Sequence, residues 1–300
     1  MINPEMSPND DAAPRALEMI DDKTTVANSA VVLLGDRSAI VQLDPDHPGF
    51  RDAAYRARRN AIAQIGLDHR PGSQVPEVDY TAQDHAVWQE VWRSLKAAHA
   101  EHACKDYLEH AKLLALPHDR IPQLWEVSER TQELSGFRLE PVAGLVHPKV
   151  FLSTLGDDVF LSTQYIRHHS TPLYTPEPDV VHELIGHAAM LASERFTKLT
   201  RLIGKAAKSA PDDEALERLG RVYWFTIEFG VLREAGALKA YGAGLLSSAG
   251  ELQAMHQAEL RPFDIAAMEA QDYDVTQYQP LLYCADSFEE MVQKLSAYYR

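Results

Sequence analysis

The sequence has few cysteines, an excess of acidic over basic residues and no long apolar run, and each of these features excludes a class of protein. Its two cysteines, Cys104 and Cys284, form no C-x-x-C pair, which predicts a reduced, cytoplasmic location and no disulfide framework. Lysine and arginine number 29 against 44 aspartates and glutamates, a net charge of −15, so we expect neither nucleic acid nor a membrane surface as a partner. No stretch of about 18 apolar residues predicts a transmembrane helix, and the first residues lack the apolar core of a signal peptide.

The chain is long enough, at 300 residues, to bury a large core without a disulfide or metal to hold it together. Residues 1–30 contain six acidic residues, three prolines and no aromatic residue, with only Arg15 and Lys23 as bases. This composition predicts a flexible acidic arm. The chain has no internal repeat, and no clear linker follows residue 45, so residues 31–300 are expected to form one domain.

Helical periodicity dominates that domain. Apolar residues recur at spacings of three and four after residue 81, and Thr81 with Asp84 forms an N-terminal cap pattern. A hairpin or edge strand is expected over 31–43, turning at Gly35-Asp36. The predicted fold class is therefore mainly α, a single helical domain with minor short β-strands. Expected helices cover about 55–67, 81–95, 104–115, 121–136 (closed by Gly136), 178–192, 194–208, 212–236, 248–256 and 286–299, and further strands 137–146 and 157–163.

The segment from residue 164 to 191 carries the densest set of reactive side chains. Pro176 and Pro178 suit the first turn of a helix, and Asp179 complements the positive end of its dipole. The helix that follows places His182 and His187 among apolar residues. Buried imidazoles must be hydrogen-bonded or bound to a metal, because leaving them unsatisfied costs free energy.

The spacing of these two histidines is unusual for a metal site. Zinc proteases place two histidines four residues apart on one helical face, with a glutamate between them. Here His187 follows His182 by five residues, which corresponds to about 140° on an ideal helix. Both reach one ion only if the helix is distorted, and Gly186 is a residue that permits distortion. A zinc hydrolase is therefore one interpretation, weakened by one residue of spacing.

A third ligand is expected from Glu228. It is the only acidic residue in the segment 221–232, and helical spacing places it on one stripe with Trp224, Ile227 and Val231. A carboxylate in such surroundings needs a cation, a cluster of donors or a raised pKa. Two neutral histidines and one carboxylate leave three coordination positions open, as in non-haem Fe(II) oxygenases. A zinc hydrolase, a non-catalytic metal-stabilised module and a set of hydrogen-bonded core residues remain the alternatives.

Three residues of the loop before this helix also carry charge or ligand atoms. Arg167 has two interpretations, a fork that binds a substrate carboxylate or a structural ion pair. His168 and His169 resemble ligands, but consecutive side chains are expected to diverge, so we exclude them.

No strand is predicted directly before the glycine-rich segment 240–252, so it is not expected to be a dinucleotide-binding fingerprint. Its two serines, Ser247 and Ser248, are expected to hydrogen-bond a ligand or a neighbouring histidine. Such a contact would determine which imidazole nitrogen faces a metal.

Six stretches between about residues 40 and 297 match one known family. They are LDPDHPGFRDAAYRARR (43–59), IPQLWEVS (121–128), GFRLEPVAGL (136–145), TQYIRHHSTPLYTPEPDVVHELIGH (163–187), YWFTIEFG (223–230) and YGAGLLSSAGEL (241–252). On these motifs the chain resembles the pterin-dependent aromatic amino acid hydroxylases, and within them the single-domain bacterial phenylalanine hydroxylases.

The resemblance implies a mostly α catalytic domain, spanning 31–300, that uses Fe(II), a tetrahydropterin and O2 to hydroxylate L-phenylalanine to L-tyrosine. Hydroxylation of phenylalanine at the 3-position or of tryptophan at the 5-position is the alternative within the family. The partner is a small aromatic amino acid, and the absence of the animal tetramerising tail predicts a monomer. The implied iron ligands are His182, His187 and Glu228; the implied substrate-binding residues are Arg167, Thr175, Pro178, Trp224, Phe229, Gly244 and Ser247; and the implied pterin-binding residues are Phe151, Glu183, Val146 and Leu161.

Three of these positions, together with Val275, bear on the choice of cofactor and substrate. Leu161 stands where animal members usually have histidine, and Val146 replaces a leucine, so the resemblance leaves the natural pterin open. Trp224 and Val275 resemble the phenylalanine type, since tryptophan hydroxylases tend to carry phenylalanine and tyrosine hydroxylases aspartate at the respective positions. An apolar pocket rejects an added hydroxyl only modestly, so weak activity on other aromatic amino acids is expected.

Overall fold

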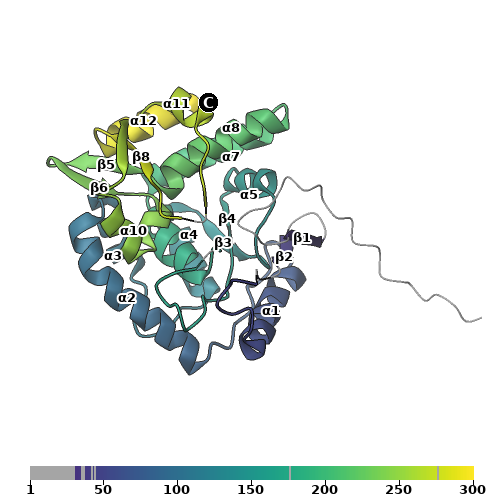
Figure 1. The fold of residues 1–300 in the computed structure, drawn as a ribbon. Helices are drawn as coiled ribbons and strands as arrows, with labels where there is room; N and C mark the ends of the chain where they lie inside the picture. Colours follow the sequence, from purple (N-terminus) through teal and green to yellow (C-terminus); the bar gives the residue numbers. More distant parts are fainter. Residues whose placement is uncertain (1–30, 35–37, 42, 44, 176, 276) are drawn as a thin grey trace, which may run out of the picture.

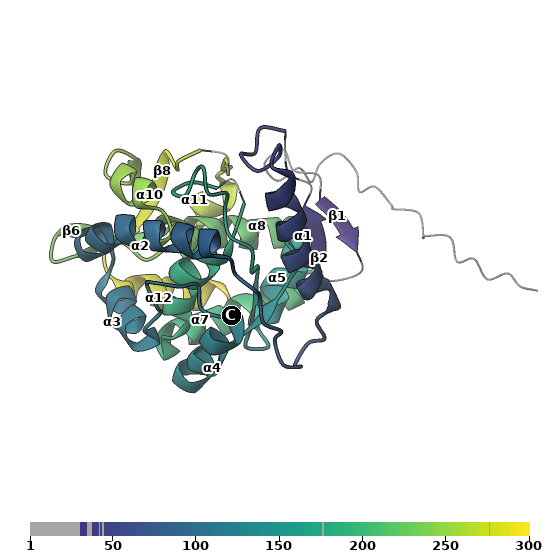
Figure 2. The same ribbon diagram turned by 90° about the horizontal axis from the view of Figure 1, so that it is seen from below.

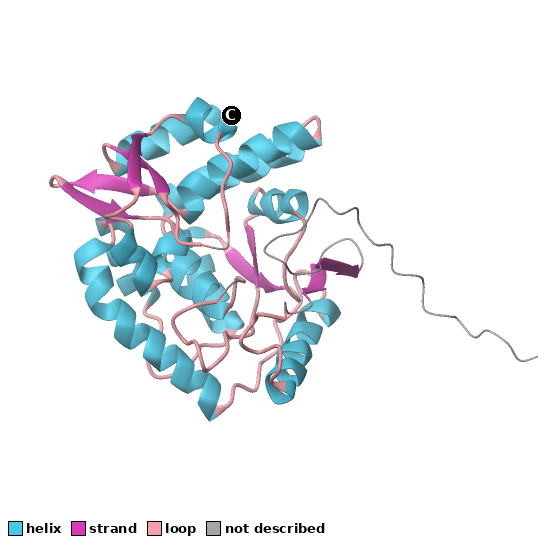
Figure 3. Cartoon of the chain, viewed as in Figure 1, coloured by secondary structure: helices cyan, strands magenta, loops and turns pink. Residues whose placement is uncertain are grey.

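The computed structural model describes residues 31–34, 38–41, 43, 45–175, 177–275 and 277–300. Helices make up about half of this part of the chain, and short strands and loops make up the rest, which confirms the predicted mainly α class (Figures 1 and 3). The predicted arm over 1–30 and the Gly35-Asp36 turn lie outside the described residues. The first elements are β1 (Val31–Leu34), β2 (Ser38–Val41), α1 (Ala53–Asp68), α2 (Ala82–His102), α3 (Lys105–Leu114), α4 (Leu124–Ser135), β3 (Arg138–Pro141), α5 (Pro148–Leu155) and β4 (Val159–Ser162).

The second half of the chain alternates helices with short strands. Two of its helical segments, named η1 and η2, are π-helices. Its elements are η1 (His182–Ala188), α6 (Ala189–Leu191), α7 (Glu194–Ser209), α8 (Asp213–Tyr223), η2 (Trp224–Glu228), β5 (Val231–Glu234), β6 (Ala237–Ala240), α9 (Ala243–Leu246), α10 (Ala249–Ala254), β7 (Glu259–Pro262), α11 (Ile265–Ala270), β8 (Leu281–Ala285) and α12 (Phe288–Tyr298).

The helix ends follow the capping signals of the sequence. Thr81 accepts a hydrogen bond from the backbone of Asp84, whose carboxylate accepts one from the backbone of Thr81, so the predicted cap of α2 is a complete capping box. Gly136 ends α4 in the left-handed conformation, with φ of 85°, as predicted for a helix-closing glycine. Asp52 caps α1 by accepting a hydrogen bond from the backbone of Tyr55.

One predicted helix was too long. The periodic stretch 212–236 is helical only as far as Glu228, and Val231–Glu234 then forms β5. Gly230 lies at the break, where a Cβ atom would come within 2.3 Å of the Thr226 carbonyl oxygen. β5 belongs to a four-stranded sheet of order β6-β5-β8-β7, which the sequence patterns did not reveal.

One short helix, α9, contacts both π-helices. α9 packs against η1 and also contacts η2, which continues directly from α8. The pair β1-β2 lies beside α1 at one edge of the domain, and the β5-β6 hairpin lies at the opposite edge (Figures 1 and 2). The described residues contain no helix both long and apolar enough to cross a lipid bilayer.

Candidate metal centre and substrate pocket

The two histidines of the VVHELIGH motif lie on a π-helix. Backbone hydrogen bonds in a π-helix join residues five apart, so residue i+5 follows residue i by about one turn. His182 begins η1, and His187 lies five residues further along it. The distortion expected near Gly186 is therefore a change of helix type. Gly186 also packs against the next layer, because a Cβ atom there would lie 2.6 Å from the carbonyl oxygen of Ala243 in α9.

Glu228 completes a three-residue cluster from the second π-helix. The Nε2 atoms of His182 and His187 are 3.0 Å apart, and they lie 3.4 and 3.2 Å from the two carboxylate oxygens of Glu228. The side chains of His187 and Glu228 are 5% and 13% exposed, and that of His182 is 17% exposed. The structure thus brings together the three residues that the sequence singled out.

The spacing of these atoms fits a metal ion. Neighbouring ligands on an octahedral ion with bonds of about 2.1 Å are about 3.0 Å apart, close to the three separations here. Two imidazoles and one carboxylate are the donor set of non-haem Fe(II) sites, which keep further coordination positions open. The residues present therefore fit a ferrous ion.

The protonation of the cluster also suits a cation. Burial lowers the pKa of His182 to about 4, which keeps this imidazole neutral. Burial acts to raise the pKa of Glu228, but the two histidines and a hydrogen bond with Tyr223 outweigh it, so its pKa lies below the usual value. Burial acts to lower the pKa of His187, and the neighbouring Glu228 outweighs that effect and raises it. The cluster presents an ionised carboxylate beside a neutral imidazole.

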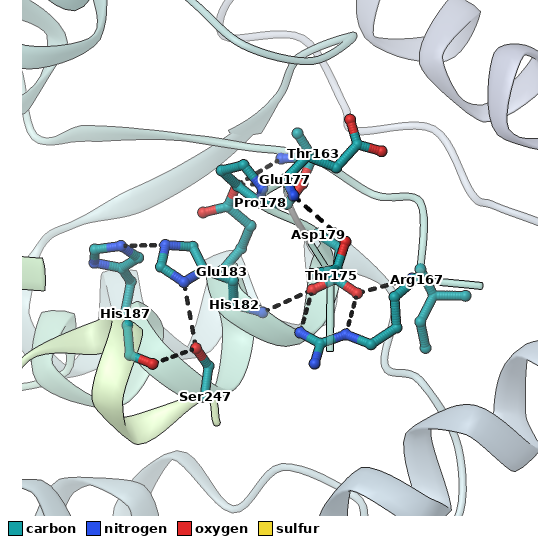
Figure 4. A network of polar contacts seen from close by, with 12 residues as sticks. Thr163, Arg167, Thr175, Glu177, Pro178, Asp179, His182, Glu183, His187 and Ser247 are labelled. Carbon is teal, nitrogen blue, oxygen red and sulfur yellow. Dashed lines mark hydrogen bonds and ion pairs between the residues drawn. The ribbon is translucent and has the colours of Figure 1, made fainter. Parts of the chain in front are cut away.

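Ser247 orients the first histidine. Its hydroxyl lies 3.3 Å from Nδ1 of His182, on the side of the ring away from the cluster (Figure 4). His99 of α2, which the sequence analysis did not identify, holds the serine segment in turn, with Nε2 lying 2.7 Å from the carbonyl oxygen of Leu246. Ser248 has a different role, since it caps α10 by accepting a hydrogen bond from the backbone of Glu251.

Arg167 forms a buried ion pair. Its Nε and Nη2 donate to the two carboxylate oxygens of Asp179 at 2.9 and 2.8 Å, and its backbone nitrogen donates to the same carboxylate at 2.8 Å. Asp179 is fully buried and also accepts a hydrogen bond from the backbone of His182 at 3.2 Å. Figure 4 shows Asp179 between these two residues. Arg167 therefore forms the structural ion pair that was one of its two interpretations. The two hydrogen bonds to Asp179 use Nε and Nη2, so Nη1 is directed away from that carboxylate.

Aromatic side chains lie at both ends of η2. Trp224 donates through Nε1 to Oε1 of Gln279 at 3.1 Å, and its ring lies 4.7 Å from that of Phe229 and stacks on Tyr273 at 4.2 Å. The Phe229 ring fills the space beside Gly244, where a Cβ atom would lie 2.5 Å from it. These contacts form one wall from three separate parts of the chain. Of the remaining expected substrate residues, Pro178 and Thr175 belong to the segment that leads into η1, and both are half-buried.

Among the residues expected to bind the pterin, Phe151 is connected to His187 through Phe160. Phe160 of β4 packs against the ring of His187 at 4.8 Å, and Phe151 of α5 packs edge-on against Phe160 at 5.6 Å. Glu183 accepts hydrogen bonds from the backbone and hydroxyl of Thr163, and burial raises its pKa to about 8. Two more members of this set, Val146 before α5 and Leu161 in β4, are half-buried.

One expectation about the loop before η1 was wrong. The consecutive side chains of His168 and His169 do not diverge, since their ring centroids are 4.2 Å apart with an interplanar angle of 38°. The backbone turns here, with the Thr171 nitrogen donating to the His168 carbonyl at 3.1 Å, and the turn places both rings side by side.

Comparisons with known proteins agree with this geometry. The family model for biopterin-dependent aromatic amino acid hydroxylases matches residues 29–300. Phenylalanine-4-hydroxylase of Rattus norvegicus is 45% identical over 263 residues, covering 86% of this chain and 58% of the relative. Tyrosine 3-monooxygenase of Mus musculus is 47% identical over 262 residues, covering 85% and 52%. The chain thus spans little more than half the length of these relatives.

Solved structures give the same answer for the fold. Phenylalanine hydroxylase of Chromobacterium violaceum, in a crystal structure with bound iron(III) and 7,8-dihydrobiopterin, superposes with a TM-score of 0.73 at 28% identity. The superposition covers 81% of this chain and 89% of that one. The cold-active phenylalanine hydroxylase of Colwellia psychrerythraea superposes with a TM-score of 0.69 at 30% identity, covering 77% and 93%.

Proposed function

Because the chain belongs to the biopterin-dependent aromatic amino acid hydroxylase family, we propose that its domain over residues 31–300 hydroxylates L-phenylalanine to L-tyrosine with O2. The observation that carries this proposal is the convergence of His182, His187 and Glu228 beside a buried arginine and an aromatic wall. No single motif supplies that combination; it arises from two π-helices and the loop that precedes the first.

The proposed cofactors are Fe(II), held by His182, His187 and Glu228, and a tetrahydropterin on the side of Phe151 and Glu183. When bound, they supply open coordination positions for O2 and the two electrons that reduce one of its oxygen atoms to water. The C. violaceum structure, which contains iron and dihydrobiopterin, supports this pair of cofactors. Ser247 fixes the orientation of the His182 ring, which lets Nε2 face the iron position.

Arg167 is proposed to bind the carboxylate of the amino acid. Asp179 neutralises its charge in the absence of substrate and holds its guanidinium plane in place through two parallel hydrogen bonds. A group positioned in this way loses little entropy when substrate binds. Thr175 and Pro178, just before Asp179, are proposed to line the same end of the pocket.

The aromatic wall is proposed to orient the substrate ring. Trp224 is held by Gln279 on one edge and Tyr273 on one face, so its indole has little freedom to move. Phe229, packed against Gly244, extends the apolar surface towards α9. Holding the ring at a fixed distance from the iron position supplies orientation, which is a large part of what a pocket contributes to rate.

The choice of phenylalanine rests on fewer residues. Val275, half-buried in the loop before β8, and Trp224 match the phenylalanine type of the family. Phenylalanine and tyrosine hydroxylases are about equally similar to this chain in sequence, so tyrosine 3-hydroxylation is the second candidate.

We also propose a cytoplasmic location, and the two free thiols of Cys104 and Cys284 support it.

The deciding experiment is product analysis. The iron-loaded protein is incubated with a tetrahydropterin, O2 and either phenylalanine or tyrosine, and the products are identified by mass spectrometry and chromatography. We expect para-tyrosine from phenylalanine and much slower formation of dihydroxyphenylalanine from tyrosine. Meta-tyrosine, or faster turnover of tyrosine or tryptophan, would change the proposed substrate or ring position. Zinc-dependent peptide hydrolysis without pterin oxidation would support the zinc hydrolase alternative.

A further inference from the structure

A second group of potential metal ligands lies outside the three-residue cluster. It consists of Asp52, at the start of α1, and the consecutive residues His168 and His169, from the loop before η1. One ligand atom from each of the three residues lies within 4.8 Å of the others. His168 is buried, Asp52 is half-buried and His169 is exposed, so the group is open to solvent on one side.

The distance between Asp52 and His168 is the first indication of a metal site. Nε2 of His168 lies 3.3 Å from Oδ2 of Asp52. Hydrogen bonds between nitrogen and oxygen are usually about 2.7–3.2 Å long, and those to a carboxylate are at the short end of that range. Two ligands of a tetrahedral zinc ion, with bonds of about 2.0–2.1 Å, are about 3.4 Å apart. The separation fits a hydrogen bond and also matches one edge of a zinc coordination tetrahedron.

The ring proton of His168 would have to move for Nε2 to bind a metal. Nδ1 accepts a hydrogen bond from the backbone nitrogen of Ser170 at 3.2 Å and lies 2.7 Å from the Ser170 hydroxyl, so Nε2 carries the proton and donates it to Asp52. A metal ion at Nε2 would shift that proton to Nδ1, where the Ser170 hydroxyl can accept it, which is the arrangement that metal-bound histidines adopt. Asp52 uses Oδ1 to cap α1 through the backbone of Tyr55 and so presents Oδ2 to the histidine.

The second imidazole is already in place. The turn that follows His168 brings the ring of His169 within 4.2 Å of it, centroid to centroid. Consecutive histidines in an extended segment would point to opposite sides, so this proximity is a property of the turn. Imidazole and carboxylate ligands together suit Zn²⁺, Cu²⁺ and Ni²⁺, whereas Mg²⁺ and Ca²⁺ prefer sites made of oxygen atoms alone.

We propose that Asp52, His168 and His169 form a second metal site, selective for an imidazole-binding divalent ion such as Zn²⁺, with water as the remaining ligand. A bound ion would join the first turn of α1 to the loop that carries Arg167. The site shares no ligand with the cluster of His182, His187 and Glu228.

Metal counting tests the site on the iron-loaded, full-length protein. Equilibrium dialysis against micromolar Zn²⁺ is followed by elemental analysis of both metals. We expect one tightly bound zinc per chain in addition to iron. His169→Gln removes an exposed ligand outside the catalytic cluster, so it should abolish zinc binding and leave iron content and basal activity unchanged. His256→Gln is the matched control, because His256 belongs to another exposed histidine pair, with Nε2 lying 3.0 Å from Nδ1 of His102.

Thermal unfolding gives an independent measurement. Zn²⁺ should raise the Tm of the parent protein and of His256→Gln by several degrees, with no shift in His169→Gln and none for any protein with Mg²⁺. Absence of a zinc equivalent beyond iron in the parent protein would overturn the proposal. So would zinc binding that persists in His169→Gln, or that is lost in His256→Gln.

Discussion

The guanidinium of Arg167 is bound to the carboxylate of Asp179 by two parallel hydrogen bonds, and both side chains are at least 95% buried. The same carboxylate accepts a hydrogen bond from the backbone of His182, the first residue of the metal cluster. One buried acid thus fixes both the group proposed to bind substrate and the start of the helix that carries two of the proposed iron ligands.

Arg167→Lys should raise the KM for the amino acid with a smaller change in kcat. Lysine keeps the charge but loses the fork that holds Asp179 and a substrate carboxylate together. Hydrogen bonds to charged groups contribute about 1.5–3 kcal/mol, which corresponds to roughly a 10- to 150-fold change in binding. Steady-state kinetics measure the effect, with Arg201→Lys on α7 as the matched control. An unchanged KM would remove the proposed role of Arg167.

Asp179→Asn should affect both the substrate and the metal. The amide keeps the size of the side chain but leaves the buried Arg167 without its counterion, and breaking a buried pair in this way costs about 3–5 kcal/mol. We expect a raised KM together with a lower iron content, measured by kinetics and elemental analysis of the same preparation. A variant with normal iron content and a raised KM would show that Asp179 acts through Arg167 alone.

Gly186→Ala should disturb the metal cluster through packing. The added methyl group would lie 2.6 Å from the backbone carbonyl oxygen of Ala243, and α9 cannot yield without moving Ser247. Overpacking of this kind costs about 1–3 kcal/mol. Urea unfolding should show that loss, and iron affinity should fall with it. Gly220→Ala in α8 is the control, because its Cβ atom would meet no neighbour within 4 Å.

Glu251 should make stability depend on pH. Burial raises its pKa to about 7, against the effect of a hydrogen bond from the backbone of Gln279. The folded state therefore binds more protons than the unfolded state between pH 4.5 and 7, and this contribution to stability is lost as pH rises through that window. The loss amounts to about 3 kcal/mol. Glu251→Gln has no carboxyl group to titrate and should not show this loss. In urea unfolding, its free energy of unfolding relative to that of the parent should therefore increase by about 3 kcal/mol from pH 5 to pH 8. Parallel curves for the two proteins would contradict the assignment.

The sequence predicted the metal cluster better than the fold around it. The five-residue spacing of His182 and His187 indicated a distorted helix. Glu228, the only acid in an apolar stripe, needed a cation or hydrogen-bond donors nearby. Its convergence with the two histidines was therefore predictable from local chemistry. The kind of distortion did not follow, because a π-helix and an α-helix have similar local composition. The sequence also did not reveal that Asp179 pairs with Arg167, because Asp179 was predicted only to complement the dipole of the helix that follows it.

The four-stranded sheet escaped prediction for a different reason. Its strands are four or five residues long, too short to show alternation, and Val231 pairs in parallel with Cys284, which lies 53 residues later in the chain. Pairing over such a separation leaves no local pattern. The proximity of the His168 and His169 rings was missed because it depends on a turn whose geometry the residue types do not specify.

The iron content of Glu228→Ala tests the central claim most directly. The parent protein and the variant are loaded anaerobically with Fe(II), desalted and analysed for metal and for hydroxylation of phenylalanine. Glu217→Ala, at an exposed position of α8, controls for the loss of an acidic residue. We expect about one iron per chain and full activity in the parent and the control, and neither iron nor activity in Glu228→Ala. Normal iron content and turnover in Glu228→Ala would contradict it.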